Sequence, residues 1–238
     1  MTEGFAYQGE ASPHRSGFRR GAPSVELSLT AFVNFIQNHD QIGNRAYGER
    51  LSMLASAEAV RAAAAVLLLA PSPPLLFMGE EWSASTPFLY FCDFAPEVAR
   101  SVAQGRRREF AHLGESIPDP SDRATFERSI LRWDERSAEP HRSMLEHYRR
   151  LLRIRATTIV PHIAGVHGRD ARYVVTDERG LRVTWETQSV SLHADINLSA
   201  HTASGFPEQL PGQTIFATHG ETYRDGVAPE WSVRWSVD

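Results

Sequence analysis

Residues 31–45 read Ala31-Phe-Val-Asn-Phe-Ile-Gln-Asn-His-Asp-Gln-Ile-Gly-Asn-Arg45, an apolar run that turns abruptly into a polar one. The apolar part, 31–37, is short and rich in β-forming residues, which predicts a buried parallel strand. An Ala- and Leu-rich segment, 56–69, predicts a helix, and the apolar run 74–78 predicts a second strand. Strand, polar loop, helix and strand in that order make a βαβ unit, so we expect a parallel sheet.

The sequence pattern changes twice after this unit, first to a helical one and then to a strand-like one. From residue 95 to 155 it is mostly helical, and residues 141–155 follow the 3.6-residue period of an amphipathic helix. Beyond Pro161, short alternating segments predict antiparallel strands. They are 172–176, 181–186, 190–197 and 214–218. We therefore expect an α/β domain over residues 1–159 and a small antiparallel β-sandwich over residues 160–238.

Composition narrows the class of function. The chain has 238 residues, a net charge of −4, one cysteine (Cys92) and no lysine. The charge gives no case for nucleic acid or an anionic membrane as partner, and one cysteine excludes an internal disulfide framework. Without lysine there is no Schiff-base or P-loop chemistry. The most apolar stretch, 62–70, is too short for the roughly 20 residues of a membrane span, and no secretory signal is present, so we expect a cytosolic protein.

The polar loop 38–44 stands where ligands bind in parallel α/β folds, beyond the carboxyl end of a strand. Asn38, His39, Asp40 and Gln41 offer a carboxylate, an imidazole and two amides, which suit a ligand rich in hydroxyl groups. The same residue types also cap helices. Spacing alone leaves both interpretations open.

A second polar loop, Glu80-Glu81-Trp82, follows the second predicted strand. Carboxylates beside an indole suit a sugar that stacks on the ring; the alternative is a paired carboxylate and a packed Trp. The run Arg106-Arg107-Arg108 could contact phosphate, but such runs are typical of a solvated helix face. The histidines lack the spacing of metal ligands, so we expect no metal and no cofactor.

Longer runs resemble a known family. Phe35-Ile-Gln-Asn-His-Asp-Gln-Ile-Gly-Asn-Arg45 resembles the region after the seventh barrel strand of the α-amylase superfamily, glycoside hydrolase family thirteen. The extension 41–45 is similar to the maltooligosyltrehalose trehalohydrolases within it. The resemblance covers residues 4 to about 155, and the β tail is in keeping with the C-terminal sandwich of these enzymes. Further matching segments are Gly4-Phe-Ala-Tyr-Gln-Gly-Glu10, Gly48-Glu-Arg-Leu51, Pro74-Leu-Leu-Phe-Met-Gly-Glu-Glu-Trp82, Gly105-Arg-Arg-Arg-Glu-Phe110, Ile117-Pro-Asp-Pro120 and Thr125-Phe-Glu-Arg128.

The resemblance implies a (β/α)₈ TIM barrel, of which this chain holds about the last two βα units. It implies hydrolysis of the α-1,4 bond next to the trehalose end of maltooligosyltrehalose, with retention and without a cofactor. Asp40 would be the family's third carboxylate, which stabilises the transition state, and His39 would bind the same sugar. With the second loop included, the expected substrate-binding residues are His39, Gln41, Ile42, Gly43, Asn44, Glu81 and Trp82.

The chain departs from the family in one respect. Retaining hydrolysis needs a nucleophile and an acid/base about 5 Å apart; the family carries them after the fourth and fifth strands, which are missing here. We expect the chain to be inactive alone and to need a partner carrying those strands, with maltooligosyltrehalose synthase as pathway partner. Its open strand edges predict aggregation. The alternatives are a non-catalytic α-glucan-binding module, or part of a glycogen branching enzyme, against which the extension 41–45 argues.

Overall fold

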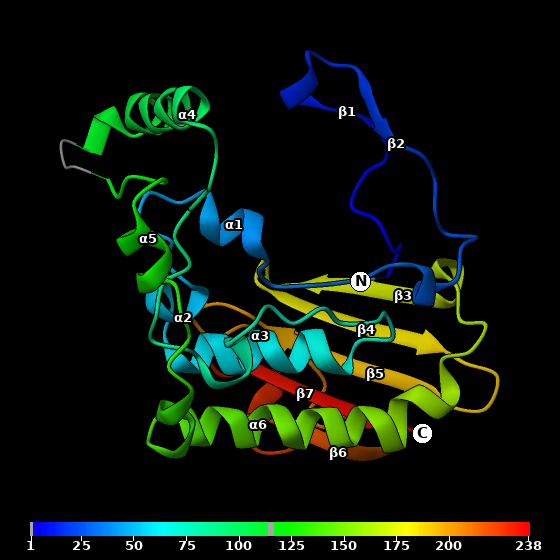
Figure 1. Ribbon diagram of the computed structural model, residues 1–238. Helices are drawn as coiled ribbons and strands as arrows, with labels where there is room; N and C mark the ends of the chain where they lie inside the picture. The colour runs from blue at the N-terminus through cyan, green and yellow to red at the C-terminus, as the bar shows by residue number, and fades with distance from the viewer. Residues whose placement is uncertain (1, 114–116) are drawn as a thin grey trace. The chain divides into compact units, whose positions relative to one another are not determined.

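The computed structural model describes residues 2–113 and 117–238 (Figure 1). The described residues divide into two compact units that interleave along the sequence. The helical unit draws on segments 36–60 and 76–148, and the sheet unit draws on segments 1–35, 61–75 and 149–238. In the described ranges, no helix is long and apolar enough to cross a membrane.

The helical unit contains the short helices α1 (His39–Gly43), α2 (Leu51–Leu54) and α5 (Arg123–Arg128) and the longer α4 (Pro96–Glu109). Two further helices, α3 (Ala57–Leu69) and α6 (His141–Ile154), begin in this unit and end in the sheet unit. The helices predicted over 56–69 and 141–155 are thus confirmed. Ser56 Oγ accepts the Ala59 N–H at 3.2 Å and caps the start of α3.

The two predicted parallel strands are reduced to a single parallel bridge between Asn34 and Pro74. The Asn34 N–H donates to the Pro73 carbonyl at 2.9 Å, and the Leu75 N–H donates to the Asn34 carbonyl at 2.8 Å. The predicted parallel pairing is therefore confirmed at one bridge, but the prediction of two extended, buried strands is wrong. Val33 is 56% exposed and Leu75 is 41% exposed. A parallel ladder is sustained by strands on both sides and layers on both faces, which the described residues do not supply here.

Among the described residues, the sheet unit holds seven strands in two sheets. Strands β1 (Gln8–Ala11) and β2 (Arg19–Gly21) form an antiparallel pair. The larger sheet is antiparallel throughout, in the order β3-β4-β5-β7-β6. Its strands are β3 (Ala171–Thr176), β4 (Gly180–Glu186), β5 (Ser191–Asn197), β6 (Gln213–Ala217) and β7 (Ser232–Val237). Each of the four tail strands predicted from the sequence corresponds to one of these.

The larger sheet has one apolar and one polar face. On the apolar face the rings of Trp185 and Trp235 stack 5.3 Å apart. On the polar face Arg234 donates to Asp195 at 2.7 Å, with both side chains 1% exposed, so the buried charges neutralise each other. Tyr223 lies under the same guanidinium. In this part of the chain the described residues form one five-stranded sheet, and Ala203 and Ala228 form an isolated antiparallel bridge outside its strands.

Candidate functional site

Helix α1 begins at a capping box that the sequence contains in full. Asn38 Oδ1 accepts the N–H groups of Asp40 and Gln41 at 2.9 and 3.2 Å, and Gln41 Oε1 accepts the Asn38 N–H at 2.7 Å. Two amides therefore satisfy the backbone donors of the first turn. The cap is made by Asn38 and Gln41, and the carboxylate of Asp40 is not needed for it.

His39 and Asp40 project into solvent from the first turn of α1. Their side chains are 70% and 69% exposed, and His39 Nε2 lies 3.4 Å from Asp40 Oδ1. This pair is the part of the predicted site that the structure brings together directly. A carboxylate with free lone pairs beside an imidazole can accept and donate hydrogen bonds to neighbouring sugar hydroxyls.

The other predicted residues of the loop are placed differently. Ile42 is 2% exposed, and Gly43 is also buried. A Cβ at Gly43 would lie 3.7 Å from the Phe88 ring, which is an ordinary contact distance. Asn44 closes α1 and is exposed. Ile42 packs the helix against the interior, so its side chain does not face a ligand.

Arg106 contacts the C-terminal end of α1, whereas the run of three arginines predicts a solvated helix face. Its guanidinium donates to the carbonyls of Gly43, Asn44 and Arg45 at 2.9–3.2 Å. Burial of Arg106 to 9% exposure removes it from the solvated face that the sequence suggested. A cation at the C-terminal end of a helix stabilises the unpaired carbonyls there. Its neighbour Arg107 pairs with Asp119 at 3.1 Å.

Glu80, in the second acidic loop, is a packed residue. It is 2% exposed, and its Oε1 accepts the Tyr148 hydroxyl at 3.1 Å. Burial raises the pKa of Glu80 to about 6, against hydrogen bonds from Gln37 and Tyr148 that lower it. Gln37 Oε1 in turn accepts the Leu51 N–H at 3.0 Å. Because Gln37 directly precedes the capping box, this chain of bonds links the two acidic loops.

Trp82 is buried to 1% exposure, and Glu81 is half-buried. The Trp82 Nε1–H donates to Glu135 at 3.0 Å, and its ring packs against Trp133 with centroids 5.2 Å apart. The indole therefore has no free face for stacking in this conformation. Trp133 is 56% exposed and is the more accessible ring of the pair.

A second buried arginine supports this loop. Arg50 is fully buried, and it donates to the carbonyls of Thr86 and Met78 at 2.6 and 2.8 Å. Burial lowers the pKa of Arg50. Gly79 is in the left-handed region at φ 84°, where a Cβ would lie 2.8 Å from Ala84 and Leu131. The sequence signal for this role of Arg50 is weak, since its partners lie 28 and 36 residues away.

The chemistry available at the site is that of recognition. Within residues 2–113 and 117–238, no group of three or more His, Cys, Asp and Glu side chains is arranged to hold a metal ion. Asp40 is a single exposed carboxylate, whereas retaining glycoside hydrolysis needs two carboxyl groups in addition to any stabilising one. Asp40 and His39 offer hydrogen bonds and a negative charge, but they do not supply that pair of carboxyl groups.

Comparison with known proteins identifies relatives of the whole chain. No family model matches. A malto-oligosyltrehalose trehalohydrolase from Deinococcus radiodurans is 43% identical over 167 residues, which are 68% of this chain and 28% of that protein. One from Rhizobium sp. (strain M-11) is 40% identical over 240 residues, which are 97% of this chain and 38% of that protein. The chain thus spans about a third of the length of the curated relatives it matches.

Solved structures are also similar to this chain. A crystal structure from Salmonella typhimurium, described as a candidate α-amylase, has a TM-score of 0.90 and 42% identity, and it matches 99% of this chain and 40% of that chain. A trehalulose synthase matches with a TM-score of 0.53 at 13% identity, over 88% of this chain and 45% of that one, which supports the fold alone. Identity near 40% along nearly all of the chain means that the chain belongs to the malto-oligosyltrehalose trehalohydrolase family, within the α-amylase superfamily of glycoside hydrolases, and corresponds to part of its members' length.

Proposed function

We propose that this chain is the C-terminal part of a malto-oligosyltrehalose trehalohydrolase, which hydrolyses the α-1,4 bond next to the trehalose end of its substrate. The observation that carries the proposal is the Asp40 carboxylate, 69% exposed at the first turn of α1 and left free by the capping box. The names of the relatives supply the substrate class. The proposed location is the cytosol, where a maltooligosyltrehalose synthase would supply the substrate.

Asp40 is the transition-state stabiliser in this proposal. As glycosidic bond cleavage develops positive charge on the sugar ring, a nearby carboxylate lowers the energy of that state. His39 donates to or accepts from a hydroxyl of the same sugar. Gln41 and Asn44 contact neighbouring sugars through their amides, and Ile42 and Gly43 shape the loop through their backbone.

Glu81 and Trp82 complete the proposed substrate-binding set. Glu81 is the half-buried acid of its loop and can accept a sugar hydroxyl. Trp82, being 1% exposed, contributes by supporting Trp133 from beneath. Trp133 is then the ring of this pair that can stack on a sugar.

The proposed domain organisation places the last two βα units of a TIM barrel in residues 1–159 and a β-sandwich in residues 160–238. The Asn34–Pro74 parallel bridge and the exposed apolar side chains around it support a barrel completed by strands from elsewhere. Those strands would bring the nucleophile and the acid/base. The β3-β4-β5-β7-β6 sheet would be the main layer of the sandwich.

The test is release of trehalose from maltotriosyltrehalose. We expect none from the purified chain, and we expect release when the chain is combined with one carrying the preceding part of a trehalohydrolase. Turnover by the chain alone at the rate of a complete relative would contradict the proposal. Saturable binding of maltooligosaccharides that His39→Ala weakens, without any complemented activity, would instead support a non-catalytic α-glucan-binding module.

A further inference from the structure

Helix α1, which carries Asp40, is too short to be stable without contacts at its ends. It has five residues, whereas isolated helices shorter than about 12 residues are marginal in water. Within residues 2–113 and 117–238, the one polar contact of the Asp40 side chain is with His39, which is itself 70% exposed. The direction of the Asp40 carboxylate is therefore set by the backbone of α1 and by the groups that hold the two ends of that helix.

The start of α1 is held by the capping box of Asn38 and Gln41, and its end is held by Arg106. The Arg106 Nη1–H donates to the Asn44 carbonyl at 3.2 Å, and the Asn44 N–H donates to the Asp40 carbonyl at 3.1 Å. Two successive hydrogen bonds thus join the guanidinium to the backbone of Asp40 itself. Nη2 of the same guanidinium donates to the carbonyls on either side of Asn44, at 3.2 and 2.9 Å.

The Arg106 guanidinium is in turn held by its surroundings. Its Cζ lies 4.9 Å from the centroid of the Tyr90 ring and 4.8 Å from that of the Phe110 ring, within the range of cation–π attraction. A carboxylate oxygen of Glu109 lies 3.5 Å from Nη1. Because Arg106 is largely buried, solvent screens these interactions only weakly. A lysine would not reproduce them, since its ammonium group is a compact charge without the plane of a guanidinium.

Helix α4 presents Arg106 on a narrow buried face. Of its 14 residues, Ala103 and Arg106 are buried, and they lie three positions apart on one side of the helix. The neighbouring Arg107 and Arg108 are exposed. The largest buried side chain of α4 is therefore the one that bonds to α1.

We propose that Arg106 is a positioning residue for the hydrolysis, which acts through the turn 43–45 to hold Asp40 at the sugar. The inference rests on the proposed role of Asp40 as transition-state stabiliser. Catalysis depends steeply on placement, and a displacement of about 1 Å can cost roughly 100-fold in rate. Without Arg106, three carbonyls at the end of α1 lose their donor, so the turn and the carboxylate that precedes it lose their fixed position.

Hydrogen exchange of the chain by itself tests this anchor without any activity. The amides of Ile42, Asn44 and Arg45 all donate within α1 or the turn that follows it. In Arg106→Gln they should exchange at least about tenfold faster, while the amides of α3 keep their protection and show that the fold persists. Arg106→Lys keeps the charge and should give a smaller increase, and it is the deciding variant if Arg106→Gln does not fold. Unchanged exchange at these amides overturns the proposal.

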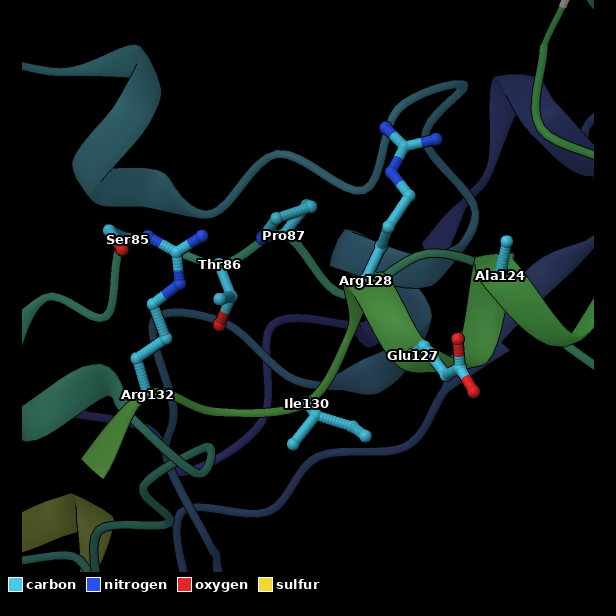
Figure 2. A pocket seen from close by; sticks show the side chains of 8 residues that line it. All are labelled: Ser85, Thr86, Pro87, Ala124, Glu127, Arg128, Ile130 and Arg132. Atoms are coloured by element: carbon cyan, nitrogen blue, oxygen red, sulfur yellow. The ribbon is translucent and has the colours of Figure 1, made fainter. Parts of the chain in front are cut away.

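The matched control is Arg128→Gln. Arg128 is an exposed arginine of α5 in the same unit, and Figure 2 shows its side chain extended at the edge of the pocket between the segment 85–87 and α5. This variant removes the same charge without a contact to α1, so exchange in the turn and kcat should stay within about twofold of the parent. Equal acceleration of exchange by Arg128→Gln would contradict the proposal, because loss of any positive charge would then suffice.

A double-mutant cycle in the complemented enzyme tests the link to Asp40. Arg106→Gln alone should lower kcat for trehalose release from maltotriosyltrehalose at least about tenfold. In the Asp40→Asn background it should lower kcat by no more than about twofold, since losses from residues that act through one group are not additive. Equal losses in the two backgrounds would mean that Arg106 does not act through Asp40.

The two experiments keep this inference apart from the proposed function. If the complemented parent releases no trehalose, the proposed function fails, whereas hydrogen exchange in the turn decides by itself whether Arg106 orders the backbone of Asp40. If the complemented parent is active and Arg106→Gln keeps its full kcat, the proposed function stands and the positioning role is overturned.

Discussion

The two acidic loops of the helical unit look alike in sequence and differ in structure. Asp40 and Glu80 each follow an apolar run, yet the Asp40 side chain is 69% exposed and Glu80 is 2% exposed. In the first loop the amides of Asn38 and Gln41 satisfy the backbone, which leaves the carboxylate to solvent. In the second loop the carboxylate itself is the packed group, bonded to Tyr148. Whether an acidic side chain is exposed or packed therefore depends on the hydrogen-bond partners around it, and not on its position after an apolar run.

Each of the two loops contacts a buried arginine that donates hydrogen bonds to backbone carbonyls. Arg106 serves the first loop through three carbonyls, and Arg50 serves the second through two. A guanidinium has five donors in a fixed plane, so it can hold several carbonyls of one turn at once. In both loops the position of the acid thus depends on an arginine far away in the sequence.

The largest difference between the loops should appear in activity. In the chain complemented with the preceding part of the enzyme, Asp40→Asn should lower kcat at least about 100-fold, because it removes the charge that stabilises the transition state. Trehalose release from maltotriosyltrehalose is the measurement. Asp93→Asn, which removes another exposed acid of the same unit, is the control and should leave kcat within about twofold. Full activity of Asp40→Asn would remove Asp40 from the mechanism.

The next largest difference should appear in stability. Glu80→Ala should lower the free energy of unfolding by about 3 kcal/mol, since it leaves a cavity and takes the acceptor from the buried Tyr148 hydroxyl. Asp40→Ala should change it by no more than about 0.5 kcal/mol, as is usual for an exposed residue. Urea denaturation followed by Trp fluorescence measures both. Equal losses in the two variants would mean that Asp40 is packed like Glu80.

Sequence reasoning succeeded where the signal is local. The helices α3 and α6 and the strands of the tail follow from periodicity over a few residues. It failed where a side chain is buried by contacts with residues far away in the sequence. Trp82 is buried through Glu135, 53 residues away, and Arg106 through α1, about 62 residues away. The strands at 31–37 and 74–78 failed for the same reason, because a parallel ladder depends on neighbours that the segment itself does not specify.

A smaller difference should appear in pH dependence. The pKa of Glu80 is raised to about 6 from an ordinary 4.5, so between these pH values the folded state holds more protons than the unfolded state. Stability contributed by Glu80 is therefore complete below pH 4.5 and falls by about 2 kcal/mol as pH rises through 6. Denaturation across this range, compared with Glu80→Gln, measures it: the variant should gain that amount relative to the parent. A constant difference between the two would mean that Glu80 titrates normally.

The smallest effect concerns the cap that frees Asp40. Asn38→Ala removes the acceptor for the N–H groups of Asp40 and Gln41 and should cost about 1 kcal/mol of stability. Asn38→Asp keeps a side-chain oxygen at the same place and caps equally well, so it should restore the loss. Affinity for maltooligosaccharides separates two roles of Asn38. If the residue acts only as a cap, Asn38→Asp restores affinity together with stability. If the Asn38 amide itself touches the sugar, Asn38→Asp restores stability alone, and recognition in this loop then extends one residue before His39.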